Sequence, residues 1–442
     1  MNIIRLNQSN DLFCYSFQKA CCAFLFMADT KKKTNYLSLL GPGLITGASD
    51  DDPSGIATYS QAGAAFGITT LWTVWFVFPM VSSIQEMCAR IGLVTSHGLA
   101  GTLKRNYPRA IVIMMILFSF PAIVLNIGAD IAGMGAVMNM MYPGVHAGIF
   151  SLVFTIFLMI MIIYLPYRKI ANVLKWLCLT LLCYIFVPFL SHLDWTEIIK
   201  QTCIPTFHWN KDFMGIIVGI LGTTISPYCF FWQASMEVEE VLQKKIIVDK
   251  KILSDMRFDI DFGMLFSNIV MYFIILSTGT ILFSNGIRQI DTVDQAALAL
   301  KPLAGNMTYL LFALGMLGTG FLAIPVLAGS LSYIISESFG WEEGLNKKFH
   351  EAKGFYLVII ISLVIALAIN FIGISPVQSL IYTAILYGIT APVLIAMILH
   401  ICNNKKIMGD FTNGKRSNIL GGITFFVMTA SALLLLFFEL KS

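Results

Sequence analysis

Three consecutive carboxylates interrupt an apolar segment near the start of the chain. Residues 37–67 are largely apolar, but Asp50, Asp51 and Asp52 lie in the middle and are followed by Pro53. Proline lacks an amide hydrogen and clashes with the preceding helical turn, so a helix is expected to break here. A break frees backbone carbonyls from intrahelical bonding. Carbonyls and carboxylates are ligands for hard cations, so the pattern predicts a cation site.

A second apolar segment, residues 213–241, is interrupted in a similar way. Pro227 lies in its middle, with Gly222 upstream. A lone proline kink would be unexceptional, but the two breaks fall in the first and the sixth apolar segments. Two sets of five spans that each open with a broken helix are typical of inverted-repeat transporters. No Lys or Arg lies near either break, so the site favours a positively charged substrate.

The composition agrees with a protein that lies in a membrane. Of the 442 residues, 57% are apolar and 12% are charged, and the mean hydropathy is +0.78. Soluble domains carry about 25% charged residues. Disorder, collagen and a secreted disulfide scaffold are excluded by the same numbers. The chain has no dense Lys/Arg block of the kind that binds nucleic acid, so no nucleic-acid partner is expected.

The apolar segments predict an all-α integral membrane protein. A helix needs about 20 apolar residues to cross the hydrocarbon of a bilayer. Eleven segments are predicted to span it: 37–67, 71–93, 110–136, 147–166, 171–190, 213–241, 263–284, 306–336, 355–373, 377–401 and 419–438. The expected organisation is an inverted 5+5 repeat with discontinuous helices one and six.

The domain organisation follows from these spans. Residues 35–442 are expected to form one transmembrane transporter domain. Repeat one covers about residues 37–190, repeat two covers about 213–401, and 419–438 is an extra helix. Residues 1–34 are expected to be a disordered tail without a function of their own.

The loop charges predict the orientation. With a cytoplasmic N-terminus, all but five of the 29 Lys and Arg residues fall on the cytoplasmic side, as the positive-inside rule requires. The exceptions are Lys200, Lys211, Arg288, Lys301 and Lys441. We therefore expect a protein of the plasma (inner) membrane whose N-terminus lies in the cytoplasm.

The residues at both breaks resemble a known family. Residues 41–43 (Gly-Pro-Gly), 52–55 (Asp-Pro-Ser-Gly) and 61–64 (Gln-Ala-Gly-Ala) resemble the first span of the Nramp divalent-metal transporters. Residues 222–228 (Gly-Thr-Thr-Ile-Ser-Pro-Tyr) resemble the sixth span of that family. The resemblance covers about residues 37–438 and implies a LeuT-like fold.

Several ligand positions of the family are substituted. Asp52 stands where the family has its metal-binding aspartate, but Gly55 replaces a ligand asparagine and Ser226 a ligand methionine. A thioether favours soft transition metals, so Ser226 removes that preference. Gly55 is expected to open space for a partly hydrated ion, since Mg²⁺ usually keeps several waters.

The proton-handling positions also differ. Tyr228 and Gln233 stand where the family has two histidines. In the third span, Asp130 survives from a D-x-x-E pattern, whereas Gly133 replaces the glutamate. Proton coupling needs groups that titrate near neutral pH along the path. Asp130 is then either a gating residue or a hydrogen-bond partner of Asn126, and the sequence favours neither.

The same substitutions resemble the Nramp-related magnesium transporter subgroup, as do residues 317–330. That resemblance implies alternating-access transport of Mg²⁺ and Mn²⁺ without coupled proton flow. The cation is the substrate, and no cofactor is expected. The implied ligands are the side chains of Asp52 and Ser226 and the carbonyls of Ser49 and Thr223. Asp51 is a candidate second charge.

Alternative functions stay open at this point. The nearest is a proton-coupled Mn²⁺/Fe²⁺ transporter of the same family. A second is a cation-coupled carrier of small solutes, although such sites usually bind a carboxylate at half-helix N-termini. A metal-sensing receptor would need a domain that transmits its signal, and the chain shows no soluble domain. An enzyme is not expected, because the sequence has no nucleophile–base set and no zinc motif.

Two groups of charged residues outside the breaks have a structural interpretation. Glu86 and Arg90 are four residues apart and are expected to form a local ion pair. Glu237, Glu239 and Glu240 follow the sixth span and are expected on a solvated surface.

Overall fold

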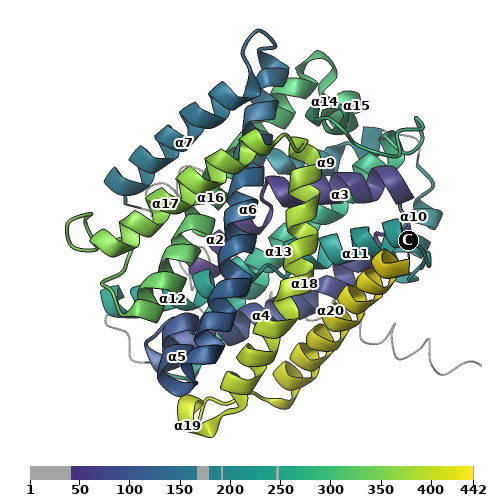
Figure 1. Ribbon diagram of the computed structural model, residues 1–442. Coiled ribbons are helices and arrows are strands. Elements are labelled where there is room, and N and C mark those ends of the chain that lie inside the picture. Colours follow the sequence, from purple (N-terminus) through teal and green to yellow (C-terminus); the bar gives the residue numbers. More distant parts are fainter. Residues whose placement is uncertain (1–40, 167–178, 191–192, 245–247, 442) are drawn as a thin grey trace, which may run out of the picture. The chain divides into compact units, whose positions relative to one another are not determined.

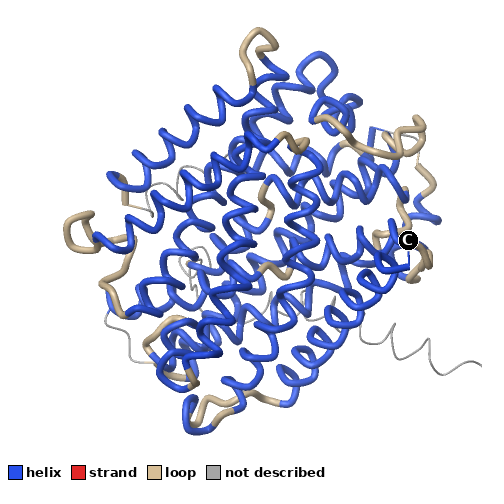
Figure 2. The backbone as a smooth tube through the Cα atoms, viewed as in Figure 1, coloured by secondary structure: helices blue, strands red, loops and turns tan. Residues whose placement is uncertain are grey.

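Every element that the structure describes is helical (Figure 2). The computed structural model describes residues 41–166, 179–190, 193–244 and 248–441. The all-α prediction is therefore confirmed for this part of the chain. The predicted tail, residues 1–34, lies outside the described residues.

The first apolar segment forms two short helices. Helix α2 (Pro42–Asp50) and helix α3 (Pro53–Phe66) are separated by Asp51 and Asp52. Both helices begin at a proline, which is favoured at the first helical position because an amide there would lack an intrahelical partner. Asp52 caps α3 with its side chain. The predicted break therefore lies at the three aspartates.

The second broken segment has the same form. Helix α11 (Lys211–Thr224) and helix α12 (Pro227–Lys244) are separated by Ile225 and Ser226. The Asn210 side chain caps α11 by accepting a hydrogen bond from the amide of Phe213. Pro227 begins α12, as Pro53 begins α3.

The two broken pairs pack reciprocally. Helix α2 lies against α12, and α3 lies against α11. Helix α13 (Lys250–Ile281) packs along α2 and α3, while α4 (Trp72–Thr95) packs along α12 (Figure 1). The helix that follows each pair thus supports the other pair.

Glycines bring α2 into direct backbone contact with α13. A Cβ on Gly47 would lie 2.2 Å from the Gly263 carbonyl oxygen, and a Cβ on Gly263 would lie 2.3 Å from the Gly43 carbonyl oxygen. Only residues without a side chain allow this approach. The inner surface of the break is therefore positioned by backbone-to-backbone packing.

Seven helical segments are long and apolar enough to cross a membrane in the described part of the chain. They are α6 (Arg109–Met141), α7 (Ala147–Tyr164), the pair Lys211–Gln243, α13, α16 (Thr308–Phe339), α18 (Pro376–Asn403) and α20 (Lys415–Lys441). Three more predicted spans coincide with α2–α3, with α4 and with α17 (Lys353–Ile369). The eleventh, 171–190, lies partly outside the described residues, so the count of eleven stays a prediction.

The second broken helix is central, whereas α7 and α20 are peripheral. In their most apolar windows, 94% of residues are buried in Lys211–Gln243, but 28% in α7 and in α20. On α7 the exposed apolar side chains recur at helical spacing: Ile149, Val153, Ile156 and Ile160. Such an apolar outer face suits contact with lipid rather than water.

Short helices connect the long ones. They are α5 (Leu99–Asn106), η2 (Leu179–Leu182), α9 (Cys183–Phe186), η3 (Pro188–Leu190), α10 (Trp195–Cys203), α14 (Val293–Ala297), η4 (Leu298–Leu300), α15 (Lys301–Ala304), η5 (Gly305–Met307), η6 (Asn370–Ile372) and α19 (Lys405–Met408). Of these, α5 matters most for the polar sites, because it follows α4 directly and packs against α16.

Candidate functional site

Asp52 lies at the first break and is held by three hydrogen bonds. Its Oδ1 accepts from the Ser54 hydroxyl at 2.6 Å and from the Gly55 amide at 2.7 Å. Its Oδ2 accepts from Asn126 Nδ2 of α6 at 2.8 Å. The residue is 1% exposed. Because the N-terminus of α3 carries partial positive charge, this position suits an acidic side chain.

Ser226 lies at the second break and hydrogen-bonds to the turn that precedes it. Its hydroxyl donates to the Gly222 carbonyl at 3.2 Å and to the Thr223 carbonyl. Both carbonyls belong to the last turn of α11, where intrahelical partners run out. The Ser226 hydroxyl and the Thr223 carbonyl, two of the predicted ligands, are therefore neighbours.

The two breaks face each other and are joined by hydroxyl groups. The Tyr228 hydroxyl donates to the Ser49 carbonyl at 3.0 Å. The hydroxyls of Ser54 and Thr223 are 3.4 Å apart. Tyr59 and Thr224 add a third contact, with 3.2 Å between their hydroxyl oxygens. Ser49, Thr223 and Ser226 thus lie at one junction with the residues that hold Asp52.

Asp50 and Asp51 make different contacts from Asp52. Ser267 Oγ of α13 lies 3.0 Å from Asp51 Oδ1 and 3.5 Å from Asp50 Oδ2. Cys229 Sγ lies 3.7 Å from Asp50 Oδ1. Both aspartates are 1% exposed. Asp51 Oδ2 has no hydrogen-bond partner within the described residues.

Asp130 is fully buried in α6, one turn after Asn126. Neither of its carboxylate oxygens has a hydrogen-bond partner among the described residues. Asn126 donates to Asp52 instead. The described residues therefore show no hydrogen bond between Asp130 and Asn126, the alternative that the sequence left open.

Gln233 links the two broken helices further from the aspartates. Its Oε1 accepts from the Thr46 hydroxyl of α2 at 2.5 Å, and its Nε2 donates to Glu237 Oε1 at 2.9 Å. Glu237 is 5% exposed. Glu239 accepts bonds from the Tyr333 hydroxyl and the Leu345 amide. The expectation of a solvated surface is wrong for Glu237, which is buried, whereas Glu239 stays partly exposed.

Gly55 does not leave open space in this conformation. A Cβ at this position would lie 3.3 Å from Thr223 Oγ1 and 3.4 Å from both the Asp50 carbonyl oxygen and the Tyr59 ring. The predicted space for a partly hydrated ion is therefore filled here by the other residues of the junction. An ion with its waters would require these groups to move apart.

The arrangement suits a cation whose ligands are mainly oxygen atoms. Burial of a carboxylate without a partner of opposite charge is costly, so Asp50, Asp51 and Asp52 attract positive charge into the junction. In the described residues, no group of three or more His, Cys, Asp or Glu side chains converges as a metal cluster. Any ion here would be bound through hydroxyls, carbonyls and water as well as single carboxylates, as Mg²⁺ sites often are.

Sequence reasoning missed two residues that hold the aspartates. Asn126 was expected only as a neighbour of Asp130, and Ser267 was not singled out at all. Both lie in long apolar helices, where a polar residue is a signal for a contact inside the helix bundle. That signal marks them as candidates but does not say which aspartate each one contacts.

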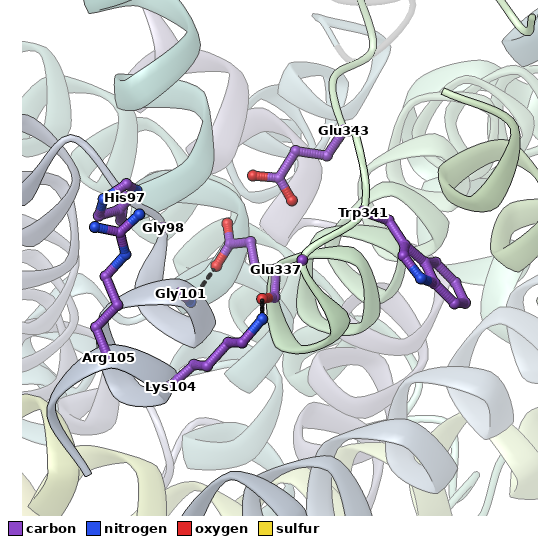
Figure 3. A pocket seen from close by; sticks show the side chains of 9 residues that line it. His97, Gly98, Gly101, Lys104, Arg105, Glu337, Trp341 and Glu343 are labelled. Atoms are coloured by element: carbon purple, nitrogen blue, oxygen red, sulfur yellow. Dashed lines mark hydrogen bonds between the residues drawn. The ribbon is translucent and has the colours of Figure 1, made fainter. Parts of the chain in front are cut away.

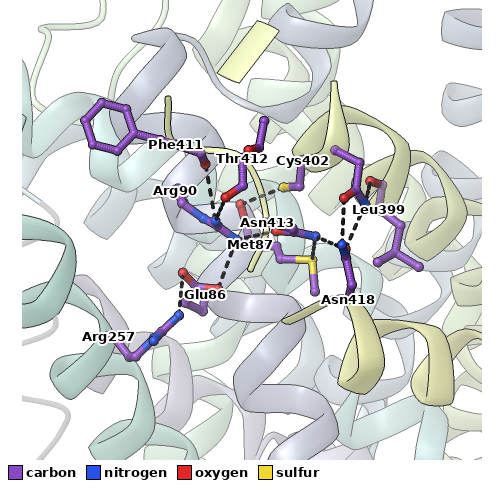
Figure 4. A network of polar contacts seen from close by, with 11 residues as sticks. Glu86, Met87, Arg90, Arg257, Leu399, Cys402, Phe411, Thr412, Asn413 and Asn418 are labelled. Carbon is purple, nitrogen blue, oxygen red and sulfur yellow. Dashed lines mark hydrogen bonds and ion pairs between the residues drawn. The ribbon is translucent and has the colours of Figure 1, made fainter. Parts of the chain in front are cut away.

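A separate polar network joins α4, α13 and the segment before α20 (Figure 4). Glu86 Oε2 lies 3.2 Å from Arg90 Nη2, so the predicted ion pair is confirmed. Glu86 Oε1 lies 3.2 Å from Arg257 Nη2. Arg90 also donates to the carbonyls of Phe411 and Thr412, each at 3.2 Å. The network fixes one end of the helix bundle and is distinct from the breaks.

A charged cavity of about 340 Å³ lies between the α4–α5 connection and the end of α16 (Figure 3). Glu337 Oε2 accepts from the Gly101 amide at 2.6 Å, and Glu337 Oε1 accepts from the Ser235 hydroxyl at 2.8 Å. Glu343 faces the same cavity, and burial together with the charge of Glu337 raises its pKa to about 9. Burial, and then the nearby Arg105, lowers the pKa of His97.

Two facing helix breaks in an apolar helical chain, with carboxylates buried at the break, define a membrane transporter of the broken-helix class. The comparisons with known proteins identify the family. Residues 43–438 match the model for Nramp, described as natural resistance-associated macrophage protein-like. Because the match covers nearly the whole chain, the protein belongs to the Nramp family.

Relatives of similar length are named as transporters and not as enzymes. The chain is 26% identical over 406 residues to the divalent metal cation transporter MntH of Caldanaerobacter subterraneus, covering 90% of this chain and 93% of that protein. It is 23% identical over 383 residues to MntH of Bacillus subtilis, covering 86% and 87%. The prediction that the chain is not an enzyme is thereby confirmed.

Solved structures share the fold. The Eremococcus coleocola manganese transporter superposes with a TM-score of 0.71 at 17% identity, covering 92% of this chain and 88% of that one. Mhp1, a nucleobase-cation-symport-1 family transporter, gives a TM-score of 0.53 at 11% identity, covering 90% and 92%. At these identities the likeness concerns the fold alone.

Proposed function

We propose that the protein carries Mg²⁺ and Mn²⁺ across a membrane by alternating access around the two helix breaks, without coupled proton flow. One observation carries the proposal: Asp52 is buried where the two breaks meet, beside further carboxylates, and its hydrogen-bond partners in the described residues are all uncharged. The names of the MntH relatives and of the Eremococcus transporter support a divalent cation as the substrate.

The oxygen donors at the junction support a hard ion. The proposed ligands are the Asp52 carboxylate, the Ser226 hydroxyl and the carbonyls of Ser49 and Thr223. In this conformation the Ser49 carbonyl accepts from Tyr228, and the Thr223 carbonyl accepts from Ser226. An arriving ion would replace these two hydrogen bonds, so its binding and the separation of the breaks would be linked.

The groups that face the junction support transport without protons. Tyr228 and Gln233 do not gain or lose protons near neutral pH, and both are engaged in hydrogen bonds across the breaks. Asp130 is a further buried acid, on α6 rather than at the breaks, and we assign it a role in gating. Soft-ion chemistry is disfavoured because Ser226 supplies oxygen where a thioether would supply sulfur.

The proposal includes the arrangement in the membrane. We infer eleven spans in an inverted 5+5 repeat, a cytoplasmic N-terminus and a location in the plasma (inner) membrane. The reciprocal packing of α2 with α12 and of α3 with α11 supports the repeat. Alternating access would then arise from movement of the broken helices relative to the remaining bundle.

Flux in proteoliposomes tests the function. Mg²⁺ entry and internal pH are recorded together for the wild type, for Asp52→Asn and for Asp212→Asn. Asparagine at position 52 can still cap α3 but lacks the charge, whereas Asp212 is exposed in the first turn of α11 and serves as the control. We expect Mg²⁺ entry without acidification in the wild type and the control, and loss of entry in Asp52→Asn.

Two outcomes would overturn the proposal. Mn²⁺ entry with internal acidification and without Mg²⁺ entry would identify a proton-coupled carrier. Uptake of an amino acid that competes with the cation would identify a small-solute carrier.

A further inference from the structure

Asp50 and Asp51 differ from Asp52 in the charge of the helix end beside them. Asp52 is at the N-terminus of α3, where the helix dipole favours an anion, and three hydrogen bonds hold it. Asp50 is the last residue of α2 and Asp51 is its C-cap. A helix C-terminus carries partial negative charge. The two carboxylates and the helix end therefore add negative charge at the same place.

The described residues provide too few hydrogen-bond donors to satisfy the carboxylates of Asp50 and Asp51. Ser267 has one hydroxyl hydrogen, yet its Oγ lies 3.0 Å from Asp51 Oδ1 and 3.5 Å from Asp50 Oδ2. Asp50 Oδ1 has the Cys229 thiol, a weak donor, at 3.7 Å. Asp51 Oδ2 has no partner within the described residues, although the side chain is 1% exposed. A buried carboxylate oxygen without a donor is strongly unfavourable.

We propose that Asp50, Asp51 and Ser267 form a second site for a hard divalent cation, on the α13 side of the first break. It would lie beside the site formed by Asp52, Ser226 and Thr223, because Asp52 contacts Asn126 of α6 whereas Asp50 and Asp51 contact Ser267 of α13. This inference rests on the proposed function in one respect, namely that the protein binds divalent cations.

The geometry suits a partly hydrated ion. Both carboxylates lie beside the same Ser267 oxygen, so a single ion can be reached from both, directly or through water. Mg²⁺ and Mn²⁺ accept such mixed oxygen coordination. An ion at this site would also neutralise the end of α2 that packs against α13. A bound ion would therefore stabilise the packing of α2 against α13.

Binding of Mn²⁺ to the purified protein tests the site. Free Mn²⁺ is measured by electron paramagnetic resonance during a titration, and the spectrum of the bound ion is recorded. We expect the wild type to bind a second equivalent of Mn²⁺, and the two bound ions to broaden each other's signals. In Asp51→Asn and in Ser267→Ala the second equivalent is expected to bind about tenfold more weakly or not at all, and the broadening to be lost.

Matched variants separate this site from the other one. Asp52→Asn is expected to lose one equivalent and to keep the equivalent that depends on Asp51. Asp261 lies on the same helix as Ser267, and its carboxylate accepts a hydrogen bond from Ser82 of α4. The variant Asp261→Asn is therefore expected to bind both equivalents of Mn²⁺. Ser267→Ala removes no charge, so it tests the site if Asp51→Asn fails to fold.

The results distinguish this proposal from the proposed function. A single equivalent in the wild type that is unchanged by Asp51→Asn and Ser267→Ala would overturn the second site and indicate that protons neutralise the pair. Two equivalents with the expected losses would support the second site even if liposomes showed no cation flux, and in that case only the proposed transport would fail.

Discussion

The Asp259 carboxylate of α13 accepts a 2.6 Å hydrogen bond from the Gly43 amide at the start of α2. It also accepts from the amides of Gly41 at 2.9 Å and Leu44 at 3.2 Å. The N-cap residue of α2 is a glycine, which has no side chain to satisfy these amides. A carboxylate from another helix thus provides the cap and fastens the first half of the broken helix.

Removal of this cap should loosen α2. Asp259→Ala deletes the acceptor of three amides, and loss of an N-cap costs about 1–2 kcal/mol. We expect amide hydrogen exchange in residues 41–50 to become about tenfold faster, because 1.4 kcal/mol corresponds to a factor of ten. Mass spectrometry of peptides from this segment measures the change.

Asp261→Ala is the control for this prediction. Asp261 lies two residues further along α13, and its hydrogen-bond partner is Ser82 of α4 rather than α2. Exchange in residues 41–50 should stay as in the wild type. Equal acceleration in both variants would contradict a specific cap and indicate general loosening of α13.

Gly47→Ala should destabilise the contact between α2 and α13. The new Cβ would lie 2.2 Å from the Gly263 carbonyl oxygen. Both groups belong to helix backbones, so the overlap is relieved only if α2 or α13 moves. Overpacking of this kind costs about 1–3 kcal/mol. A lower melting temperature in detergent is the expected result. Gly422→Ala in α20, where a Cβ meets no atom within 4 Å, should be neutral or stabilising by up to ~1 kcal/mol. If Gly422→Ala lowered the melting temperature as much as Gly47→Ala, the packing argument would be refuted.

Ser226→Met should shift selectivity toward soft ions. A thioether at the second break adds a soft ligand beside Asp52, which favours Cd²⁺ over Mg²⁺. We expect the ratio of Cd²⁺ to Mg²⁺ uptake in liposomes to rise by about tenfold, the equivalent of about 1.4 kcal/mol. Ser226→Ala removes the hydroxyl without adding sulfur, so it should weaken uptake without raising the ratio. The same ratio in both variants would argue against Ser226 as a ligand.

Glu343 should make the folded protein less stable as pH rises. Its pKa is about 9 in the folded protein against an ordinary value of 4.5, chiefly because of burial and then the charge of Glu337. Folding is therefore coupled to binding of a proton by Glu343. The stability that this proton contributes is lost as the pH rises from about 4.5 to about 9. The charged or titratable groups around it are Glu337, Lys347, Glu239, Glu342, His97, Lys104 and Arg105.

Glu343→Gln should remove this pH dependence. We expect its melting temperature to match the wild type near pH 5 and to exceed it increasingly toward pH 9. Glu342→Gln is the control, because Glu342 is exposed and the ion pair with Lys347 lowers its pKa. If the melting temperatures of the wild type and Glu343→Gln changed with pH in parallel, the Glu343 carboxyl could not be neutral and buried in the folded protein.

Local sequence signals predicted the elements that form the site. Pro53 and Pro227 predicted both helix breaks, because proline cannot continue a helix from the preceding turn. The buried aspartates predicted a positively charged substrate. The resemblance at residues 52–55 and 222–228 predicted the family that the comparisons establish. These features depend on neighbouring residues in the chain, so a sequence contains them directly.

Longer-range contacts were predicted poorly. Glu237 was expected at a solvated surface, but it bonds Gln233 beneath neighbouring helices. Asn126 was expected to bond Asp130 in its own helix, but it reaches Asp52 on another. A helical pattern says which residues share a face, but it does not say which helix that face meets.

The sequence by itself determined the membrane environment, the two breaks and the charge of the site, because hydropathy, proline and aspartate act locally. Only the tertiary structure decided how the three aspartates differ. Asp52 is bound by Asn126 of α6, whereas Asp50 and Asp51 share Ser267 of α13. The physical reason is that adjacent residues at an unwound turn point in different directions, and the helices packed on each side determine which donors they meet.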